Sequence, residues 1–257
     1  MDEVDESRMT LVEHLAELRN RLIKSVIAVV LGGVVCWIVY DLLLDVLLAP
    51  YCATIGDADA TLAGEGECSL LVTDPLEGFA LRLKVAAYGG IALAMPVILW
   101  QLWRFITPGL YSHERRYAVP FVGSGLVLFV LGAGLAYWTL PRALAFLQSI
   151  GGPNLVEAYS PSPYLNLIIY MMLAFGIGFE FPIVLIFLQI AGVLHWRQLA
   201  RFRRYAIVGI VVLVAVITPS GDPFSLMVLS VPMYLFYEAA ILFGRLRARR
   251  RARAETS

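Results

Sequence analysis

Long stretches without charged residues constrain the fold of this chain more than any other feature of its sequence. Several run for roughly 20 residues, the length that a helix needs to cross the ~30 Å hydrocarbon core of a bilayer. Of the 257 residues, 60% are hydrophobic and 16% are charged, whereas a soluble domain has about 45–50% apolar and about 25% charged residues. We therefore predict an all-α polytopic membrane protein, which excludes a soluble enzyme, a disordered adaptor and a nucleic-acid binder.

The apolar stretches predict six transmembrane helices separated by polar segments. The fifth stretch holds only 13 residues, or about 20 Å of helix. We therefore expect either a thinned bilayer or a covering neighbouring helix at that point. The last two spans are expected to be short and to form a helical pair on the cytoplasmic side. The predicted spans are Ile23–Leu44, Val85–Phe105, Val119–Leu140, Tyr164–Ile190, Tyr205–Ile217 and Pro223–Phe243.

The distribution of basic residues predicts the orientation, because Lys and Arg beside a span are retained on the cytoplasmic side. Alternate segments, beginning with the N-terminal one and ending with the tail, hold 17 of the 20 basic residues. The other three are Arg82, Lys84 and Arg142. Both termini are therefore predicted to be cytoplasmic. We expect one membrane domain over 1–257, with a cytoplasmic amphipathic helix at 1–22, an external loop at 45–82 and a basic cytoplasmic tail at 244–257.

The patterns of common catalytic sites are missing from the sequence. Neither lysine follows a glycine, as a P-loop requires, and no serine stands in a Gly-x-Ser-x-Gly turn. The three histidines, His14, His113 and His195, are isolated from one another and do not have the spacing of a zinc site. We therefore expect no enzymatic activity, no metal ion and no cofactor.

The three cysteines do not point to catalysis either. Cys36 lies inside the first predicted span, where a thiol packs as a small apolar group. Cys52 and Cys68 share the predicted external loop, where an oxidising compartment permits a disulfide. A Cys52–Cys68 bridge is favoured over two unpaired thiols.

Glu180 is the carboxyl group that the sequence places deepest in the membrane. It lies in the middle of the fourth predicted span, two residues before Pro182, which frees the backbone carbonyl of Gly178. A carboxyl group at that depth costs a few kcal/mol unless it faces water or a partner. We favour a functional carboxyl here over a protonated glutamic acid that hydrogen-bonds to a neighbouring helix.

Two cytoplasmic segments have ordinary explanations when they are considered alone. In the N-terminal segment, leucines recur at helical spacing, and Glu17 precedes Arg21 by one turn, as in a common intrahelical ion pair. In the second loop, Trp and Tyr lie at a span end with arginines beyond them, as at many membrane interfaces, and Glu114 directly precedes two arginines. Periodicity alone favours a purely structural amphipathic helix for the first segment.

Four motifs, in order along essentially the whole chain, together resemble the TatC family, the receptor subunit of the twin-arginine protein translocase. The six-span topology with cytoplasmic ends agrees with this resemblance. The motifs are Leu11-x-Glu13-His14-Leu15-x-Glu17-Leu18-Arg19-x-Arg21-Leu22, Phe105-x-x-Pro108-x-Leu110-Tyr111-x-x-Glu114-Arg115-Arg116, Phe175-Gly176-x-x-Phe179-Glu180-x-Pro182 and Thr218-Pro219-x-x-Asp222-Pro223.

The resemblance implies that the protein binds signal peptides with paired arginines and helps to move folded proteins across the plasma membrane of a prokaryote. By motif position, Glu17 and Glu114 receive the two arginines, and Arg19 and Phe105 shape the same surface. The guanidinium fork suits bidentate pairing with a carboxylate. Glu180 is implied to face the apolar part of the signal peptide or the partner subunits. Supporting roles are implied for Glu13, His14, Pro108 and Asp222.

The implied partners are signal peptides, small single-span Tat subunits of the TatA and TatB type, the lipid bilayer and further copies of the chain; no nucleic acid is expected. The implied energy source is the proton-motive force. Many family members carry a Gln where this chain has Leu226 after Phe224-Ser225, which leaves the docking contact of the small subunit open.

The main alternative is a secondary transporter that uses Glu180 as a proton or sodium site. Such transporters place paired broken helices in two related halves. Pro96, Pro182 and Pro232 interrupt the second, fourth and sixth spans without an evident inverted match. An intramembrane enzyme is a weaker alternative, because no nucleophile with a base is visible. A pure scaffold would tolerate glutamine at Glu17, Glu114 and Glu180.

Overall fold

The computed structural model describes residues 11–52, 74–106, 118–151, 161–190, 192–218 and 221–255. These residues form eight helices and no strand, which confirms the all-α prediction for the described part of the chain. The helices are α1 (Leu11–Ile38), α2 (Tyr40–Cys52), α3 (Glu77–Ile106), α4 (Ala118–Gly151), α5 (Pro161–Ile190), α6 (Trp196–Arg201), α7 (Arg203–Ile217) and α8 (Pro223–Glu255).

Five of these helices, α1, α3, α4, α5 and α8, are long and apolar enough to cross a membrane. The fifth predicted span corresponds to α7, which has 15 residues and so confirms the expected short helix. The neighbouring α8 differs from the prediction. It continues past Phe243 through the basic tail and has 33 residues, because Arg and Ala are among the strongest helix-forming residues.

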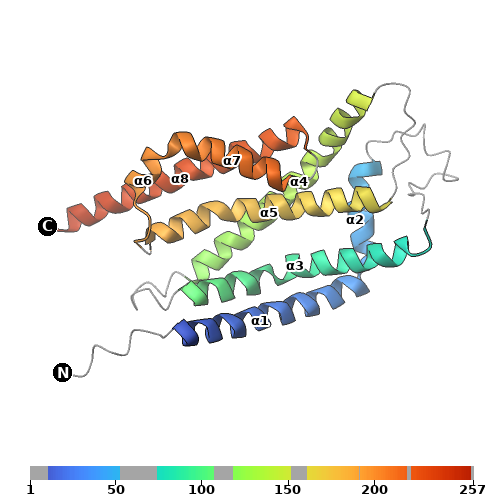
Figure 1. Ribbon diagram of the computed structural model, residues 1–257, viewed down its shortest axis with the longest axis horizontal. Helices are drawn as coiled ribbons and strands as arrows, with labels where there is room; N and C mark the ends of the chain where they lie inside the picture. Colours follow the sequence, from blue (N-terminus) through green and yellow to red (C-terminus); the bar gives the residue numbers. More distant parts are fainter. Residues whose placement is uncertain are drawn as a thin grey trace.

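The first span begins and ends earlier than the sequence predicts. The amphipathic segment and the apolar run form one helix, α1, in which the stretch long and apolar enough to cross a membrane covers Leu15–Ile38, whereas the predicted span was Ile23–Leu44. The chain then turns into α2, which crosses the bundle near the beginnings of α3 and α5, opposite the end where α1 starts (Figure 1). Two tyrosine hydroxyl groups hold α2 there: Tyr137 donates to Val46 O at 2.9 Å, and Tyr164 donates to Leu47 O at 2.8 Å.

Other predicted boundaries also move outward. α3 begins at Glu77 and α4 ends at Gly151, so both helices extend beyond the apolar runs Val85–Phe105 and Val119–Leu140. Parts of the predicted external loop 45–82 are therefore helical, at 45–52 and at 77–82. Hydropathy identifies only the apolar part of a helix, whereas backbone hydrogen bonds continue into polar residues.

Small residues bring α1 and α3 close together. A Cβ on Gly90 would lie 2.6 Å from both Gly33 N and Val29 O, and a Cβ on Gly32 would lie 2.9 Å from Gly90 O. Such close approach of two backbones is typical of helix pairs in membranes. Apart from this contact, α1 is largely exposed along its length.

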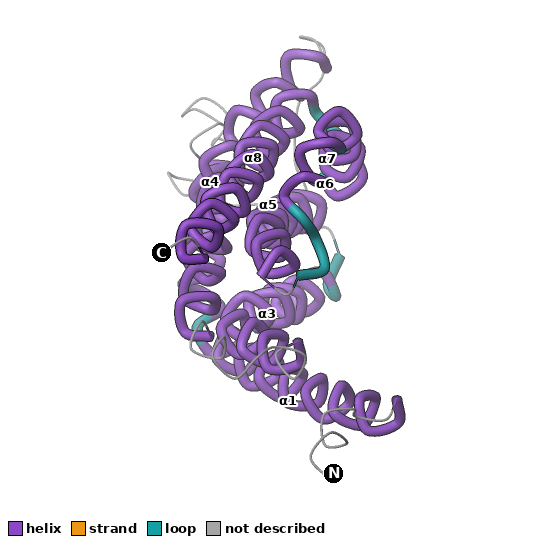
Figure 2. The backbone as a smooth tube through the Cα atoms, turned by 90° about the vertical axis from the view of Figure 1, so that its left-hand side faces the viewer, coloured by secondary structure: helices purple, strands orange, loops and turns teal. Residues whose placement is uncertain are grey.

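The core lies where α5 packs against α4 and α8. Phe175, Ile168, Leu140 and Ala240 are completely buried there. Figure 2 shows α5 in the middle of the bundle, with α3 on one side and α6, α7 and α8 on the other. Glu180 therefore belongs to the most enclosed helix of the molecule.

Candidate functional site

Glu17 and Arg21 form the predicted ion pair on one face of α1. Arg21 Nε donates to Glu17 Oε1 at 3.1 Å, and Arg21 Nη2 donates to the same oxygen. The other carboxylate oxygen, Glu17 Oε2, is buried and has no hydrogen-bond partner within the described part of the chain. Glu17 thus keeps one oxygen available for a further donor.

The packing of α1 on α3 places Glu17 at the level of Phe105. Gly33 lies against Gly90, and the two helices run in opposite directions. Glu17 precedes Gly33 by 16 residues and Phe105 follows Gly90 by 15, so at ~1.5 Å per residue each lies about 23 Å from that contact. Glu17 and Phe105, two of the residues implied to bind the peptide, therefore lie at the same end of the bundle.

The structure describes some of the residues implied to bind or support the peptide and not others. Arg19 is exposed on α1 and Phe105 is half-buried near the end of α3. Glu13 and His14 belong to α1, but their side chains lie outside the description. Glu114 and Pro108 lie outside the described residues.

One end of the bundle gathers the segments that the charge pattern assigns to the cytoplasm. Figure 1 shows the start of α1, the end of α3, the end of α5, α6 and the end of α8 on the same side. Arg19, Arg104, Arg197 and Arg245 belong to these segments. The basic segments that the charge pattern groups together therefore lie at one end of the bundle.

Glu180 of α5 packs closely against α3 and α4 at a point where α4 carries a glycine. Its side chain is only 9% exposed. A Cβ on Gly125 of α4 would lie 3.0 Å from Glu180 Oε2 and 2.7 Å from Leu99 Cδ1 of α3. Met95, Leu99 and Phe129 form a small apolar cluster in the same region.

The Glu180 carboxyl group is incompletely paired. Its Oε1 atom is buried and makes no hydrogen bond to any residue that the structure describes. A buried polar atom without a partner costs about 1–3 kcal/mol. The arrangement therefore suits a carboxyl group that receives or donates a hydrogen bond when a partner helix or peptide arrives.

Comparison with known proteins identifies the family. The family described as "Sec-independent protein translocase protein (TatC)" matches residues 13–232. A TatC protein of Frankia casuarinae is 42% identical over 97% of this chain and 69% of its own length. That of Aquifex aeolicus is 39% identical over 95% of this chain and 98% of its own length. A crystal structure of the twin arginine translocase receptor TatC superposes with a TM-score of 0.74 at 39% identity, over 91% of this chain and 99% of that one.

The chain belongs to the TatC family.

The TatC match covers all four motifs except Leu11 at the start of the first one, and it includes the turn between α7 and α8. Gly221 takes a positive φ of 60° in this turn, which glycine adopts without strain. Asp222, 2% exposed, is the cap of α8: its Oδ1 accepts from Ser225 N at 2.7 Å, and Pro223 follows as the first helical residue. Asp222 thus has a structural role that accounts for the motif, and a supporting role in binding stays a prediction.

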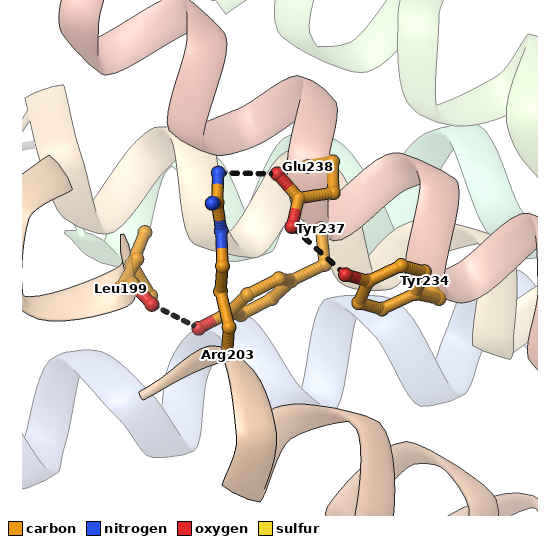
Figure 3. Close-up of polar contacts among 5 residues, drawn as sticks. All are labelled: Leu199, Arg203, Tyr234, Tyr237 and Glu238. Carbon is orange, nitrogen blue, oxygen red and sulfur yellow. Dashed lines mark hydrogen bonds and ion pairs between the residues drawn. The ribbon is translucent and has the colours of Figure 1, made fainter. Parts of the chain in front are cut away.

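Glu238 is a second carboxylate inside a predicted span, and the sequence pattern did not single it out. Glu238 of α8 accepts from Arg203 Nη2 at 2.7 Å and from the Tyr234 hydroxyl at 3.0 Å (Figure 3). Beside it, the buried Tyr237 donates to Leu199 O of α6 at 2.8 Å. The available signal was a Glu inside the span Pro223–Phe243, together with an Arg at the start of the preceding helix. Glu238 lies beyond the range that matches the TatC family.

Two of the three cysteines, Cys36 and Cys52, belong to the described residues. Cys36 is a free, buried thiol in α1, and a Cβ on Gly89 of α3 would lie 2.7 Å from its Sγ. This agrees with the expected packing role. Cys52 is the last residue of α2, whereas Cys68 lies outside the described residues, so their pairing stays a prediction.

Proposed function

We propose that this chain is the receptor subunit of a twin-arginine protein translocase in the plasma membrane of a prokaryote. In this role it binds the paired-arginine signal peptides of folded cargo proteins on its cytoplasmic face. Membership of the TatC family carries the proposal. Additional support comes from the position of Glu17, which lies level with Phe105 and has one unpaired carboxylate oxygen.

The proposed recognition uses two carboxylates for two guanidinium groups. Glu17 and Glu114 each accept the fork of one signal-peptide arginine. At Glu17, the incoming arginine takes the unpaired Oε2 and competes with Arg21 for Oε1. Phe105 lies level with this carboxylate and shapes the surface next to it, together with Arg19. A lysine in the peptide offers one compact charge in place of the fork, so it binds less well.

The membrane part of the mechanism involves Glu180. Its unpaired oxygen receives a hydrogen bond from the signal peptide or from a small single-span subunit of the TatA or TatB type. The chain associates with these subunits and with further copies of itself, and the proton-motive force drives the movement of folded cargo. Because the peptide site and Glu180 are on different helices and at different depths, substitutions at one should leave the other intact.

Peptide binding tests the proposal directly. A labelled twin-arginine peptide and its twin-lysine version are titrated against the purified protein in a membrane mimetic, at matched salt, because ion pairs are screened. Wild type is compared with Glu17→Gln and Glu114→Gln. Asp45→Asn is the matched control, since Asp45 is an exposed acid on α2 near the opposite end of the bundle.

Selective binding of the twin-arginine peptide that both glutamine variants weaken, while the control retains it, would support the receptor assignment. Equal binding of both peptides, unchanged in the variants, would remove these carboxylates from the mechanism. The secondary-transporter alternative with Glu180 as the ion or proton site would then be tested by proton and sodium flux in vesicles.

A further inference from the structure

Two arginines from different helices meet at one tryptophan where α6 packs against α8. The guanidinium carbons of Arg197 in α6 and Arg245 in α8 each lie 5.5 Å from the centre of the Trp196 ring. The two carbons are therefore at most 11 Å apart, twice that distance. We call the three side chains Trp196, Arg197 and Arg245 the α6–α8 corner.

The fold holds this corner in place. A Cβ on the buried Gly244 of α8 would lie 2.8 Å from Trp196 Cβ, so the missing side chain allows α6 to approach α8 closely. Gln189, at the end of α5, donates from Nε2 to Ala240 O at 2.9 Å and fastens the same part of α8. The Tyr237 hydroxyl donates to Leu199 O and ties α8 to α6 (Figure 3). Trp196 therefore lies on a helix that packs directly against α8, which α5 holds in turn.

The positive charge of the corner is not balanced within the described part of the chain. The ion pairs there are Arg21–Glu17 and Arg203–Glu238, and neither includes Arg197 or Arg245. Both arginines are exposed. Two like charges held about one Debye length apart repel each other unless an anion joins them. The planar, five-donor guanidinium group matches a phosphate better than any other cationic side chain.

The surroundings favour a phosphate that is attached to an acyl chain. On α8, Leu242, Arg245 and Leu246 share one face, since residues three and four apart are neighbours on a helix. Leu242 is 55% exposed and Leu246 is 48% exposed. Leu242 lies towards the apolar part of α8, and Trp is typical of the headgroup level of a membrane. An amphiphile with its phosphate on the arginines and its chain along Leu242 fits this face.

We propose that the α6–α8 corner binds the phosphate of an anionic phospholipid in the cytoplasmic leaflet. The leaflet follows from the predicted orientation of the chain. A lipid bound here would lie beside the start of α7, the short helix that leaves a membrane of normal thickness incompletely spanned. The site is separate from Glu17 and from Glu180, so its test does not depend on the proposed receptor function.

Native mass spectrometry of the purified full-length protein in detergent tests the site. The protein is titrated with phosphatidylglycerol and, separately, with phosphatidylcholine. We expect wild type to bind one phosphatidylglycerol at least fivefold more tightly than phosphatidylcholine. The double variant Arg197→Gln/Arg245→Gln should lose this preference. The single variant Arg245→Gln, at an exposed position, should weaken it severalfold if the double variant does not fold.

The matched control is Arg201→Gln/Arg204→Gln, which removes the same charge from two exposed arginines of α6 and α7. It should retain the preference for phosphatidylglycerol. An equal loss in the control would show that diffuse charge, not the corner, attracts the lipid and would overturn the proposal. The absence of any preference in wild type would do the same. Displacement of phosphatidylglycerol by an equal concentration of inorganic phosphate would identify a free-phosphate site instead of a lipid site.

Discussion

At the scale of single residues, carboxyl groups dominate the chemistry of this protein, and their neighbours separate their roles. Asp222 has its backbone donor and caps α8. Glu238 has two donors, Arg203 and Tyr234. Glu17, Glu180 and Asp222 each keep one buried oxygen without a partner among the described residues. Because an unpaired buried oxygen is costly, these three acids are the ones that gain most from a further hydrogen-bond donor.

Replacing either proposed receptor carboxylate should weaken signal-peptide binding. We expect Glu17→Gln and Glu114→Gln each to lower the affinity for a twin-arginine peptide by about 1–3 kcal/mol, the range for a charge-assisted bond. If the two arginines bind as one unit, the loss in the double variant should be smaller than the sum of the single losses. Isothermal titration of the four proteins measures this coupling, and strictly additive losses would indicate two independent contacts.

Gly125 should be as sensitive as Glu180 itself. The Cβ of Gly125→Ala would displace the carboxyl group of Glu180 or the side chain of Leu99. We expect lower transport of folded cargo into inverted membrane vesicles, together with unchanged affinity for the signal peptide. Gly123→Ala is the control, because a Cβ there meets nothing within 4 Å. Normal transport by Gly125→Ala would count against a role for the position of Glu180.

At the scale of helices, close contacts and single hydrogen bonds hold together elements that are individually apolar. α1 depends on glycine contacts with α3. α6, with six residues, is too short to be stable alone. It rests on α8 through the Tyr237 hydroxyl and through Trp196 against Gly244. These interfaces, rather than helix propensity, determine where the short elements lie.

The α1–α3 contact should tolerate no side chain at Gly90. A methyl group there would lie 2.6 Å from the backbone of Gly33, so Gly90→Ala should destabilise the protein by about 1–3 kcal/mol, as overpacking does. Gly134→Ala is the matched control, because a Cβ on Gly134 meets nothing within 4 Å. It should be neutral or slightly stabilising, since Ala is the better helix former. Unfolding by sodium dodecyl sulfate in mixed micelles compares the two; equal stability would contradict the tight interface.

Two tyrosines one turn apart on α8 should respond differently to loss of their hydroxyl groups. Tyr237→Phe removes a buried donor from the carbonyl of Leu199, which keeps only its bond from Phe202 N at 3.1 Å. The loss of this link between helices should cost about 0.5–1.5 kcal/mol. Tyr234→Phe removes one of two donors from the partly exposed Glu238, and exposed contacts of this kind contribute less. Thermal unfolding in detergent is the measurement. A larger loss in Tyr234→Phe would reverse the order of importance.

At the scale of the whole molecule, the fold separates a basic end from an enclosed centre. Glu17, Arg19 and Phe105 belong to the start of α1 and the end of α3, and the α6–α8 corner lies at the same end of the bundle (Figure 1). Glu180 lies inside, between α3, α4 and α5.

Labelling of single cysteines should decide the predicted topology. In a variant with Cys36, Cys52 and Cys68 replaced by serine, Thr61→Cys should react with a membrane-impermeant maleimide in intact cells. Ser257→Cys should react only after the membrane is opened. The reason is the concentration of Lys and Arg in alternate segments. Labelling of Ser257→Cys in intact cells would place the C-terminus outside and would require a different number of spans.

Local chemistry accounts for the features that could be predicted from the sequence. Uncharged runs identify the membrane helices because an unpaired charge in hydrocarbon is costly. A run of 13 residues can form only a short helix, and α7 is short. The pair Glu17–Arg21 follows from helical spacing alone. The motifs around Glu17, Phe105, Glu180 and Asp222 were sufficient to suggest the family, to which the chain belongs.

Only the tertiary structure decided which of these residues meet. Hydropathy alone does not reveal the turn at Val39 that sends α2 across the bundle, because mostly apolar residues continue on both sides of it. Gly125 of α4 lies against Glu180 of α5, and Arg203 of α7 pairs with Glu238 of α8, so each contact involves two different helices. The contacts of Arg197 and Arg245 with the Trp196 ring likewise bring α6 and α8 together. Spacing along one helix specifies neighbours within that helix, whereas contacts between helices depend on how small residues allow them to approach.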